Sequence, residues 1–220
     1  MMKKILHSVC QPLLVTLVLM LICGLGYPLV LTGISAVVFP NQANGSLVEY
    51  DGQVVGSAHV GQLFTEDYFM KGRPSAVGYN TYWTDENGNA VNADGSEFGG
   101  LASGSQNLGP SNPALVERVE ADMESFLAAH PEVRPEDIPT DLMTASGSGL
   151  DPHISPASAE IQIPGIASAS GLSEKTLRTI VQNNTTGRML GIFGEPTVNV
   201  LGVNLEIAAA MGLSLNGAES

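Results

Sequence analysis

The feature that most constrains this 220-residue chain is a run without any charged side chain, from Val9 to Phe39. The run consists mostly of Leu, Val, Ile and small residues. A membrane-spanning helix needs about 20 apolar residues, whereas the apolar stretch of a cleaved signal peptide has about 7–15. The run is longer than a signal peptide requires and contains no Ala-x-Ala cleavage site. We therefore expect one retained transmembrane helix, roughly Leu13–Val37, and treat a cleaved signal as the alternative.

The charges on either side of this run predict how the chain crosses the membrane. Lys3 and Lys4 are the only Lys or Arg residues before Glu49, and no acidic residue precedes Glu49. By the positive-inside rule they hold the N-terminus in the cytoplasm. The sequence thus predicts an N-terminal transmembrane anchor, residues 1–40, and one extracytoplasmic domain, residues 41–220.

The predicted outer domain is strongly acidic. From Glu49 onward the chain has 22 acidic and seven basic side chains, a formal net charge of −15. Such a surface argues against nucleic acid or anionic lipid headgroups as the main partner, because both need basic patches. Both cysteines, Cys10 and Cys23, lie in the apolar run. The outer domain therefore has no disulfide and no thiol chemistry.

Local patterns in the outer domain predict a mixed α+β fold. Residues 47–55 form two short β runs around Asp51-Gly52, a strong hairpin signal. Residues 84–109 are rich in Gly, Asn, Ser and Asp and indicate a long surface loop. A helix is expected after Asn112, a good N-cap followed by Pro113, and it ends before Pro131.

Three further elements are expected toward the C-terminus. A helix starts at Ser155-Pro156 and ends near Gln162, before Pro164. Another is capped by Ser173, with Leu172 and Leu177 placed as a hydrophobic staple. Residues 188–207 alternate apolar stretches with Gly and Pro, and we expect strands there with Val198, Val200 and Leu201 in the core.

One stretch of the outer domain contains the residue types of an active site or a ligand site. It is residues 144–155, here called the signature loop, with the sequence Thr-Ala-Ser-Gly-Ser-Gly-Leu-Asp-Pro-His-Ile-Ser. The nucleophile elbow Gly-x-Ser-x-Gly is not matched, because Ser148 has glycine on both sides. A P-loop needs a lysine after its last glycine, and Leu150 follows Gly149. Asp151 and His153 give only two metal ligands close together. No catalytic or metal-binding residues are predicted from these motifs.

Other interpretations of the signature loop remain open. A serine hydrolase could use Ser148 with His153, and a run of backbone N–H groups could hold an anion. A third possibility is a Ser-Gly turn leading into a helix capped by Asp151 or Ser155. Elsewhere, Asp85-x-Asn87-x-Asn89 starts like a calcium loop but has Ala90 where glycine is required.

Several long motifs in one order give a resemblance that single motifs cannot. They are Gly61-Gln62-x-Phe64 with Arg73-Pro74-Ser75-Ala76 and Tyr79-Asn80, then Ser105-Gln106-Asn107-Leu108-Gly109-Pro110-Ser111-Asn112-Pro113, the signature loop, Gly194-Glu195-Pro196, and Val198-Asn199-Val200-Leu201. Together they resemble the KdpC family, the C subunits of the bacterial Kdp high-affinity potassium pump. The resemblance covers nearly the whole chain, including the single N-terminal membrane helix.

The resemblance implies a non-catalytic subunit of an ATP-driven potassium import complex in the bacterial cell (inner) membrane. Its implied partners are a channel-like potassium-translocating subunit, a P-type ATPase subunit, a small single-span subunit and the lipid bilayer. The family's C subunit assembles or stabilises the complex and is described as a catalytic chaperone that raises the ATP affinity of the ATPase subunit. ATP is thus implied only through the complex, with no tightly bound cofactor. The alternative is an anchored extracytoplasmic serine hydrolase or ligand-binding domain unrelated to transport.

The residues expected to dock on partners, here called the signature residues, are taken from these motifs. They are Gln62, Phe64, Arg73, Pro74, Ser75, Tyr79, Asn80, Asn107, Leu108, Ser111, Asn112, Ser146, Gly147, Ser148, Gly149, Asp151, His153, Ser155, Gln162 and Asn199. Three positions depart from the family pattern, since Gly165, Ser170 and Thr197 stand where the family has arginine. Because no other side chain supplies arginine's planar fork of donors, these losses argue against direct ATP binding.

Overall fold

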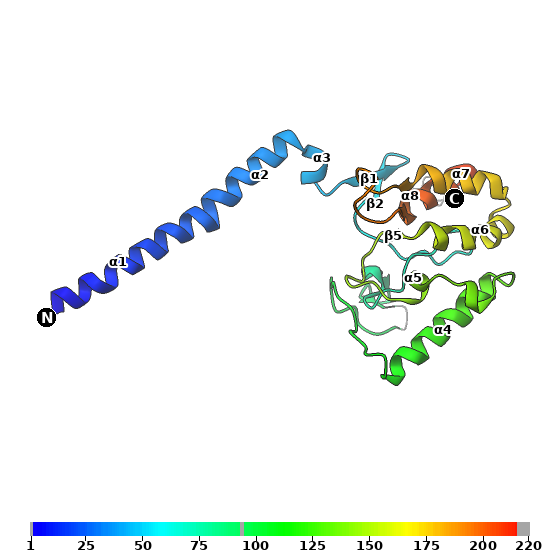
Figure 1. Ribbon diagram of the computed structural model, residues 1–220, viewed down its shortest axis with the longest axis horizontal. Helices are drawn as coiled ribbons and strands as arrows, with labels where there is room; N and C mark the ends of the chain where they lie inside the picture. The colour runs from blue at the N-terminus through cyan, green and yellow to red at the C-terminus, as the bar shows by residue number, and fades with distance from the viewer. Residues whose placement is uncertain (1, 93–94, 215–220) are drawn as a thin grey trace. The chain divides into compact units, whose positions relative to one another are not determined.

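The computed structural model describes residues 2–92 and 95–214, and only the backbone of residues 2–9, so the side chains of Lys3 and Lys4 lie outside the description. The chain divides into two compact units between Leu47 and Val48. The first unit contains α1 (Met2–Leu21), a π-helical turn (Ile22–Gly26), α2 (Tyr27–Val38) and the short α3 (Pro40–Ala43), drawn in blue in Figure 1.

The first unit carries the long apolar helix that the sequence predicts. A membrane-spanning candidate runs from Cys10 to Val38 with a mean hydropathy of 2.4, and its window has no buried residues. A helix that is apolar on all sides and buries none of its surface suits the hydrocarbon core of a bilayer. The π turn has a local cause: Tyr27 N–H donates to Ile22 O, and the next residue, Pro28, has no N–H to continue the regular pattern.

The second unit starts with the predicted hairpin. Strands β1 (Leu47–Tyr50) and β2 (Gln53–Ser57) pair with each other. Asp51 and Gly52, at the turn, have φ values of 52° and 77°. These left-handed conformations match the twist of a tight hairpin, and Asp-Gly adopts them readily.

The predicted surface loop is partly ordered into a second, smaller hairpin. Strands β3 (Trp83–Thr84) and β4 (Ala90–Val91) pair antiparallel, with Trp83 opposite Val91. Ala93 and Asp94 of this loop lie outside the described residues. A 3-10 turn (Gly78–Asn80) precedes the hairpin, and a 3-10 turn (Pro135–Asp137) and α5 (Thr140–Met143) follow the long α4 (Pro113–Ala129). Asn112 caps α4 as predicted, accepting from Ala114 N at 3.0 Å.

The core lies between three helices and a small sheet. These are α6 (Pro156–Ser170), α7 (Glu174–Asn183), α8 (Val200–Met211) and the antiparallel sheet β5-β7-β6, made of His153–Ile154, Thr197–Asn199 and Thr185–Thr186. The buried cluster includes Met70, Ile154, Ala159, Ile163, Ile166, Leu177, Ile180, Val181, Val198, Val200, Val203 and Ile207. Leu172 packs against the same cluster as Leu177, as the predicted staple requires.

Two expectations about these elements are wrong. Helix α6 does not end near Gln162 but continues through Pro164 to Ser170. Its buried face carries Ile163 and Ile166 on both sides of the proline, so packing offsets the one backbone hydrogen bond that proline removes.

Residues 188–207 are not a set of strands. Only Thr197–Asn199 is a strand, and α8 begins at Val200. The switch is made by Asn199, whose Oδ1 accepts from Gly202 N at 2.9 Å and so caps α8. Val198, Val200 and Leu201 are nevertheless all in the core, as predicted.

Candidate functional site

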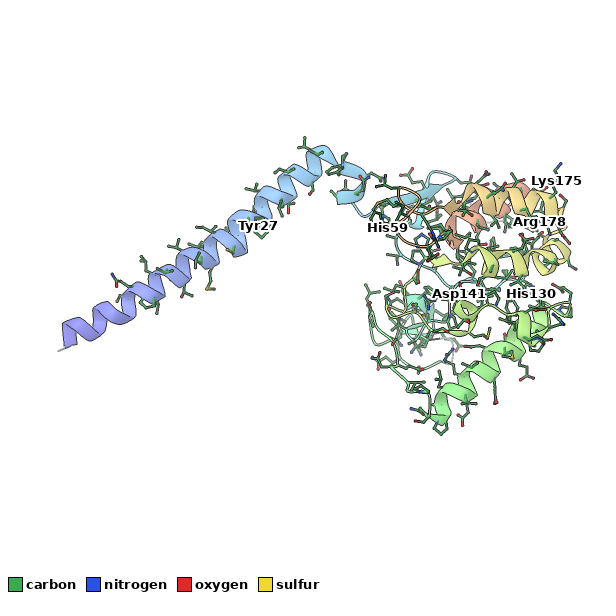
Figure 2. All side chains as sticks on the ribbon, viewed as in Figure 1. Tyr27, His59, His130, Asp141, Lys175 and Arg178 are labelled. Atoms are coloured by element: carbon green, nitrogen blue, oxygen red, sulfur yellow. The ribbon has the colours of Figure 1, made fainter. Side chains whose placement is uncertain are left out.

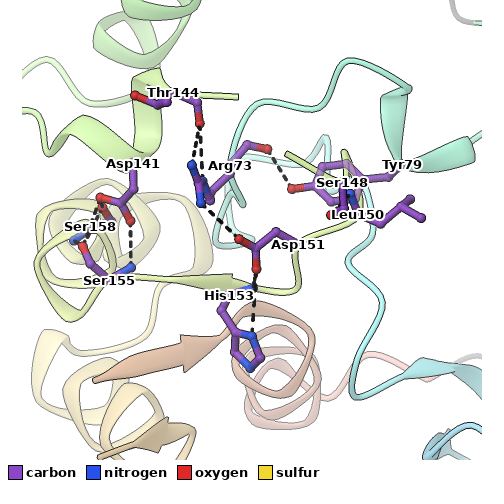
Figure 3. Close-up of polar contacts among 10 residues, drawn as sticks. All are labelled: Arg73, Tyr79, Asp141, Thr144, Ser148, Leu150, Asp151, His153, Ser155 and Ser158. Atoms are coloured by element: carbon purple, nitrogen blue, oxygen red, sulfur yellow. Dashed lines mark hydrogen bonds and ion pairs between the residues drawn. The ribbon is translucent and has the colours of Figure 1, made fainter. Parts of the chain in front are cut away.

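An ion pair joins the first motif to the signature loop. Arg73 Nη1 lies 3.1 Å from Asp151 Oδ2, and the remaining nitrogens of Arg73 donate to Thr144 O at 3.2 and 3.4 Å (Figure 3). The guanidinium therefore binds Thr144, the first residue of the signature loop, and Asp151 at once. Asp151 also accepts from His153 N at 3.0 Å, which sets the turn into β5.

Tyr79 and Ser75 also stabilise the first motif and its contact with the signature loop. Tyr79 Oη donates to Arg73 O at 2.7 Å, and Ser75 Oγ donates to Gly149 O at 2.6 Å. Ser75 Oγ accepts in turn from Tyr79 N at 3.0 Å. Burial, together with the nearby Asp151 carboxylate, raises the pKa of the Tyr79 hydroxyl to about 12. The phenol therefore stays neutral and keeps its donor role at physiological pH.

The Ser-Gly turn of the signature loop lies very close to neighbouring segments. Gly149 has φ +69°, and a Cβ there would lie 2.6 Å from Val77 Cγ2 and 2.9 Å from Gly104 O. The turn also uses its own N–H groups: Gly149 N donates to Ser146 O at 3.3 Å, and Leu150 N donates to Ser148 Oγ at 3.1 Å. These two donors are engaged within the loop and are therefore not free for an anion.

The hydrolase interpretation is not supported by the geometry. The described contact of Ser148 Oγ is with Leu150 N, and no described contact joins Ser148 to His153. His153 Nδ1 lies 3.9 Å from Asp151 Oδ1, beyond hydrogen-bond distance. Among the described residues, no group of three or more His, Cys, Asp or Glu side chains could hold a metal ion.

A cleft of about 410 Å³ beside the ion pair is the natural place to test the fit of ATP. Its cations are Lys71 and Arg73, and Asp67 and Asp122 line it as well. Lys71 Nζ already donates to the carbonyl groups of Phe64 and Glu66 at 3.1 and 2.6 Å, and burial lowers its pKa. With both cations engaged and two carboxylates present, the cleft does not fit a triphosphate.

The other signature residues mostly hold the fold together. Gln62 Nε2 donates to Val55 O at 2.6 Å, Asn80 pairs with the backbone of Ala102, and Asn199 Nδ2 donates to Ala58 O at 3.0 Å. Gln162 is buried, and its Oε1 accepts from Lys71 N at 2.8 Å. The signature residues with exposed side chains or backbone are Asn107, Ser111, Asn112, Gly147 and Ser148.

Two structural side chains were missed in the sequence. Asp141 Oδ2 accepts from Ser155 N at 2.7 Å, and its Oδ1 accepts from Ser158 Oγ at 2.6 Å, at the start of α6. Asn204, buried in α8, binds the backbone of Met70. A polar residue within the apolar sequence of α8 indicates a buried hydrogen bond. The sequence does not indicate that its partner is Met70.

The three departures from the family pattern lie in different surroundings. Gly165, on α6, faces the buried ring of His130, and a Cβ there would collide with His130 Nδ1. His130 lies at the end of α4 (Figure 2). An arginine side chain has no room at this position. Ser170 ends α6, and Thr197 pairs with Thr186 at the edge of the small sheet.

The fold and the site together define a class: a membrane-anchored α+β protein whose motif residues fasten loops to one another. Comparison with known families matches residues 9–209 to the family described as "KdpC: K+-transporting ATPase, c chain". The chain belongs to this family, and is a subunit of the potassium-transporting ATPase complex.

Individual relatives support the same assignment. The chain is 57% identical over 212 residues to the "Potassium-transporting ATPase KdpC subunit" of Clostridium kluyveri, covering 96% of this chain and 98% of the relative. It is 55% identical over 202 residues to the protein of that name in Clostridioides difficile, with 91% and 96% covered. The Rhodopseudomonas palustris (strain BisB18) protein of that name is 44% identical over 205 residues, with 93% and 99% covered.

Proposed function

We propose that this subunit is non-catalytic, and that its domain lies outside the cytoplasm and docks on the membrane subunits of the pump. The proposed partners are the channel-like, ATP-hydrolysing and small single-span subunits. The observation that supports the proposal is the bonding of the family's motif residues, which connect neighbouring segments into one platform. Arg73, Asp151 and Tyr79 are engaged with one another and with backbone.

The exposed part of this platform is the surface proposed to dock. It consists of residues 103–108 and 147–148, which we call the docking loops. Gly104 N donates to Ser148 O at 2.8 Å, and Ser103 Oγ donates to the same oxygen at 3.1 Å. Two segments far apart in sequence thus present one surface, and Gly147, Ser148 and Asn107 are exposed on it.

We further propose that the effect on ATP affinity is indirect. Lys3 and Lys4 favour a cytoplasmic N-terminus, which puts the domain on the side away from cytoplasmic ATP. The engaged cations of the cleft also do not suit a triphosphate. Docking would therefore act by favouring the state of the membrane subunits in which the ATP-hydrolysing subunit binds ATP more tightly.

Gly147→Arg tests docking. Gly147 is exposed, and a Cβ added there would meet no other atom within 4 Å, so the substitution adds bulk to the docking loops without disturbing the fold. We expect reduced co-purification with co-expressed membrane subunits and a raised KM for ATP of the assembled pump. Gln182→Arg, on the exposed side of α7, is the matched control. Co-purification and KM unchanged by Gly147→Arg would contradict the proposed surface.

Orientation has its own test. Cys10 and Cys23 are replaced by serine, and a single cysteine is placed at the exposed Ser168. We expect a membrane-impermeant maleimide to label it in intact cells. Labelling only after cell lysis would place the domain in the cytoplasm and remove the reason for an indirect effect.

A further inference from the structure

The connection between β6 and β7 carries an exposed apolar tip that the docking loops do not include. Its side chains are Met189, Leu190, Ile192 and Phe193, which are 67%, 83%, 73% and 59% exposed. Each of them is the kind of side chain that a fold normally buries. Four together at one turn indicate a contact surface rather than scattered surface residues.

The tip has a defined shape. Met189 N donates to Phe193 O at 2.8 Å and Phe193 N donates to Met189 O at 3.0 Å, so the two residues face each other across a tight turn. Leu190 has φ +55°, a left-handed conformation that costs energy for a residue with a Cβ. The turn thus holds an unfavourable backbone conformation while presenting leucine to the outside.

The charge of the tip differs from that of the rest of the domain. Residues 189–194 have no charged side chain, and the flanking Arg188 and Glu195 pair with each other at 2.7 Å. The tip is therefore a neutral apolar projection on a domain of strongly negative charge. Such a projection, with an aromatic and aliphatic side chains and no hydrogen-bonding side-chain groups of its own, suits the acyl boundary of a bilayer.

The chain itself keeps this domain close to a bilayer. The apolar span ends at Val38 and the second unit begins at Val48. The intervening residues 39–47 reach about 30 Å at most when extended. Strand β7, which supports the tip, is also tied to the start of the domain, because Asn199 Nδ2 donates to Ala58 O at 3.0 Å.

We propose that the apolar tip inserts into the lipid bilayer, as a second, interfacial membrane contact of this subunit. Leu190, Ile192 and Phe193 would lie about 5–10 Å below the headgroup level. This contact would restrain the orientation of the domain above the membrane. The tip would reach lipid in either orientation of the chain, whether or not the docking loops bind a partner.

Quenching by brominated lipid tests the insertion directly. The only tryptophan, Trp83, is replaced by phenylalanine, and Phe193→Trp is introduced into the full-length chain. The protein is reconstituted into nanodiscs of phosphatidylcholine with or without bromine on the acyl chains. We expect Trp fluorescence at position 193 to be strongly reduced by the brominated lipid and shifted to shorter wavelength.

Two single-tryptophan controls in the same background make the result decisive. Tyr27→Trp reports on the transmembrane helix and should be quenched, whereas Val116→Trp, on α4 and 50% exposed, should not. An unquenched Phe193→Trp beside a quenched Tyr27→Trp would overturn the proposal. Protection from aqueous iodide that occurs only in the assembled pump, without lipid quenching, would show a protein partner instead and also overturn it. An unquenched Tyr27→Trp would show that the apolar helix does not lie in the bilayer, and this would also overturn the proposal.

Discussion

The side-chain amide of Asn204 forms two hydrogen bonds with the backbone of Met70. Its Oδ1 accepts from Met70 N at 2.7 Å and its Nδ2 donates to Met70 O at 2.9 Å, so a side chain on α8 acts as a strand partner for an irregular segment. Gln162 on α6 does the same to Lys71, at 2.8 and 3.3 Å. The segment leading into Arg73 is therefore held in the core by amides, and the ion pair depends on them for its position.

Asn204→Leu should destabilise the protein substantially. Leucine has the same branching of heavy atoms, with larger methyl groups in place of the amide oxygen and nitrogen. It leaves the buried N–H and C=O of Met70 without partners, and each costs about 1–3 kcal/mol. We expect the free energy of unfolding to fall by about 2–4 kcal/mol in chemical denaturation followed by Trp83 fluorescence. Gln182→Leu, on the exposed side of α7, is the control and should change it by less than about 0.5 kcal/mol. Equal effects of the two variants would contradict this role for Asn204.

Gly149→Ala should be far more damaging than Gly147→Ala, although the two glycines are two residues apart. Gly149 combines a left-handed φ of +69° with close neighbours, Val77 and Gly104, whereas Gly147 has open space. We expect a loss of about 2–4 kcal/mol for Gly149→Ala and less than about 1 kcal/mol for Gly147→Ala. Thermal unfolding of both variants, measured side by side in the same detergent, checks the difference. Similar melting temperatures would show that the turn does not need the glycine.

Gly165→Ala should destabilise the protein even though alanine is the better helix former. In an exposed helix this change gains about 1 kcal/mol, but here the added Cβ collides with the ring of His130. We expect a net loss of about 1–3 kcal/mol, typical of overpacking. Removing the ring should reduce the effect, although the added Cβ would still lie 3.0 Å from Ala129 O. Gly165→Ala made in a His130→Ala background is therefore expected to cost less than in wild type, and an undiminished loss there would place the strain elsewhere.

The sequence predicted the elements whose causes are local. Asp51-Gly52 specifies its own turn, and Asn112 and Ser173 cap the helices that directly follow them. In each case the residues that decide the structure lie within four positions of one another. The KdpC resemblance was likewise readable, because it rests on the order of long motifs along the chain.

The wrong expectation about α6 arose where distant contacts decide the structure. Pro164 ends a helix in an isolated segment, yet α6 continues because Ile163 and Ile166 are buried in the core. The strands expected over residues 188–207 have a different explanation, because the local cap at Asn199 was missed and α8 begins at Val200. The signature residues were expected to dock on partners, but for most of them the structure shows bonds within the domain. Their docking role stays a proposal.

Asp141→Asn should make the free energy of unfolding depend less on pH in the acidic range. Burial raises the pKa of the Asp141 carboxyl, but the hydrogen bonds from Ser158 and Ser155 outweigh it, so the pKa lies below its usual value of 3.8. A carboxyl with a lowered folded-state pKa stabilises the protein above its unfolded-state pKa, and that contribution is lost as the pH falls through the lowered value. At about pH 7 the variant should be less stable than wild type by about 1–3 kcal/mol, since one acceptor for the start of α6 is gone. At about pH 3 and below, the difference should shrink, because the wild-type carboxyl loses its advantage as it is protonated. Unfolding free energies measured across this pH range check the prediction, with a substitution at an exposed position, Glu136→Gln, as the control. A difference between variant and wild type that stays constant down to the lowest pH would show that the charge of Asp141 does not stabilise the cap of α6.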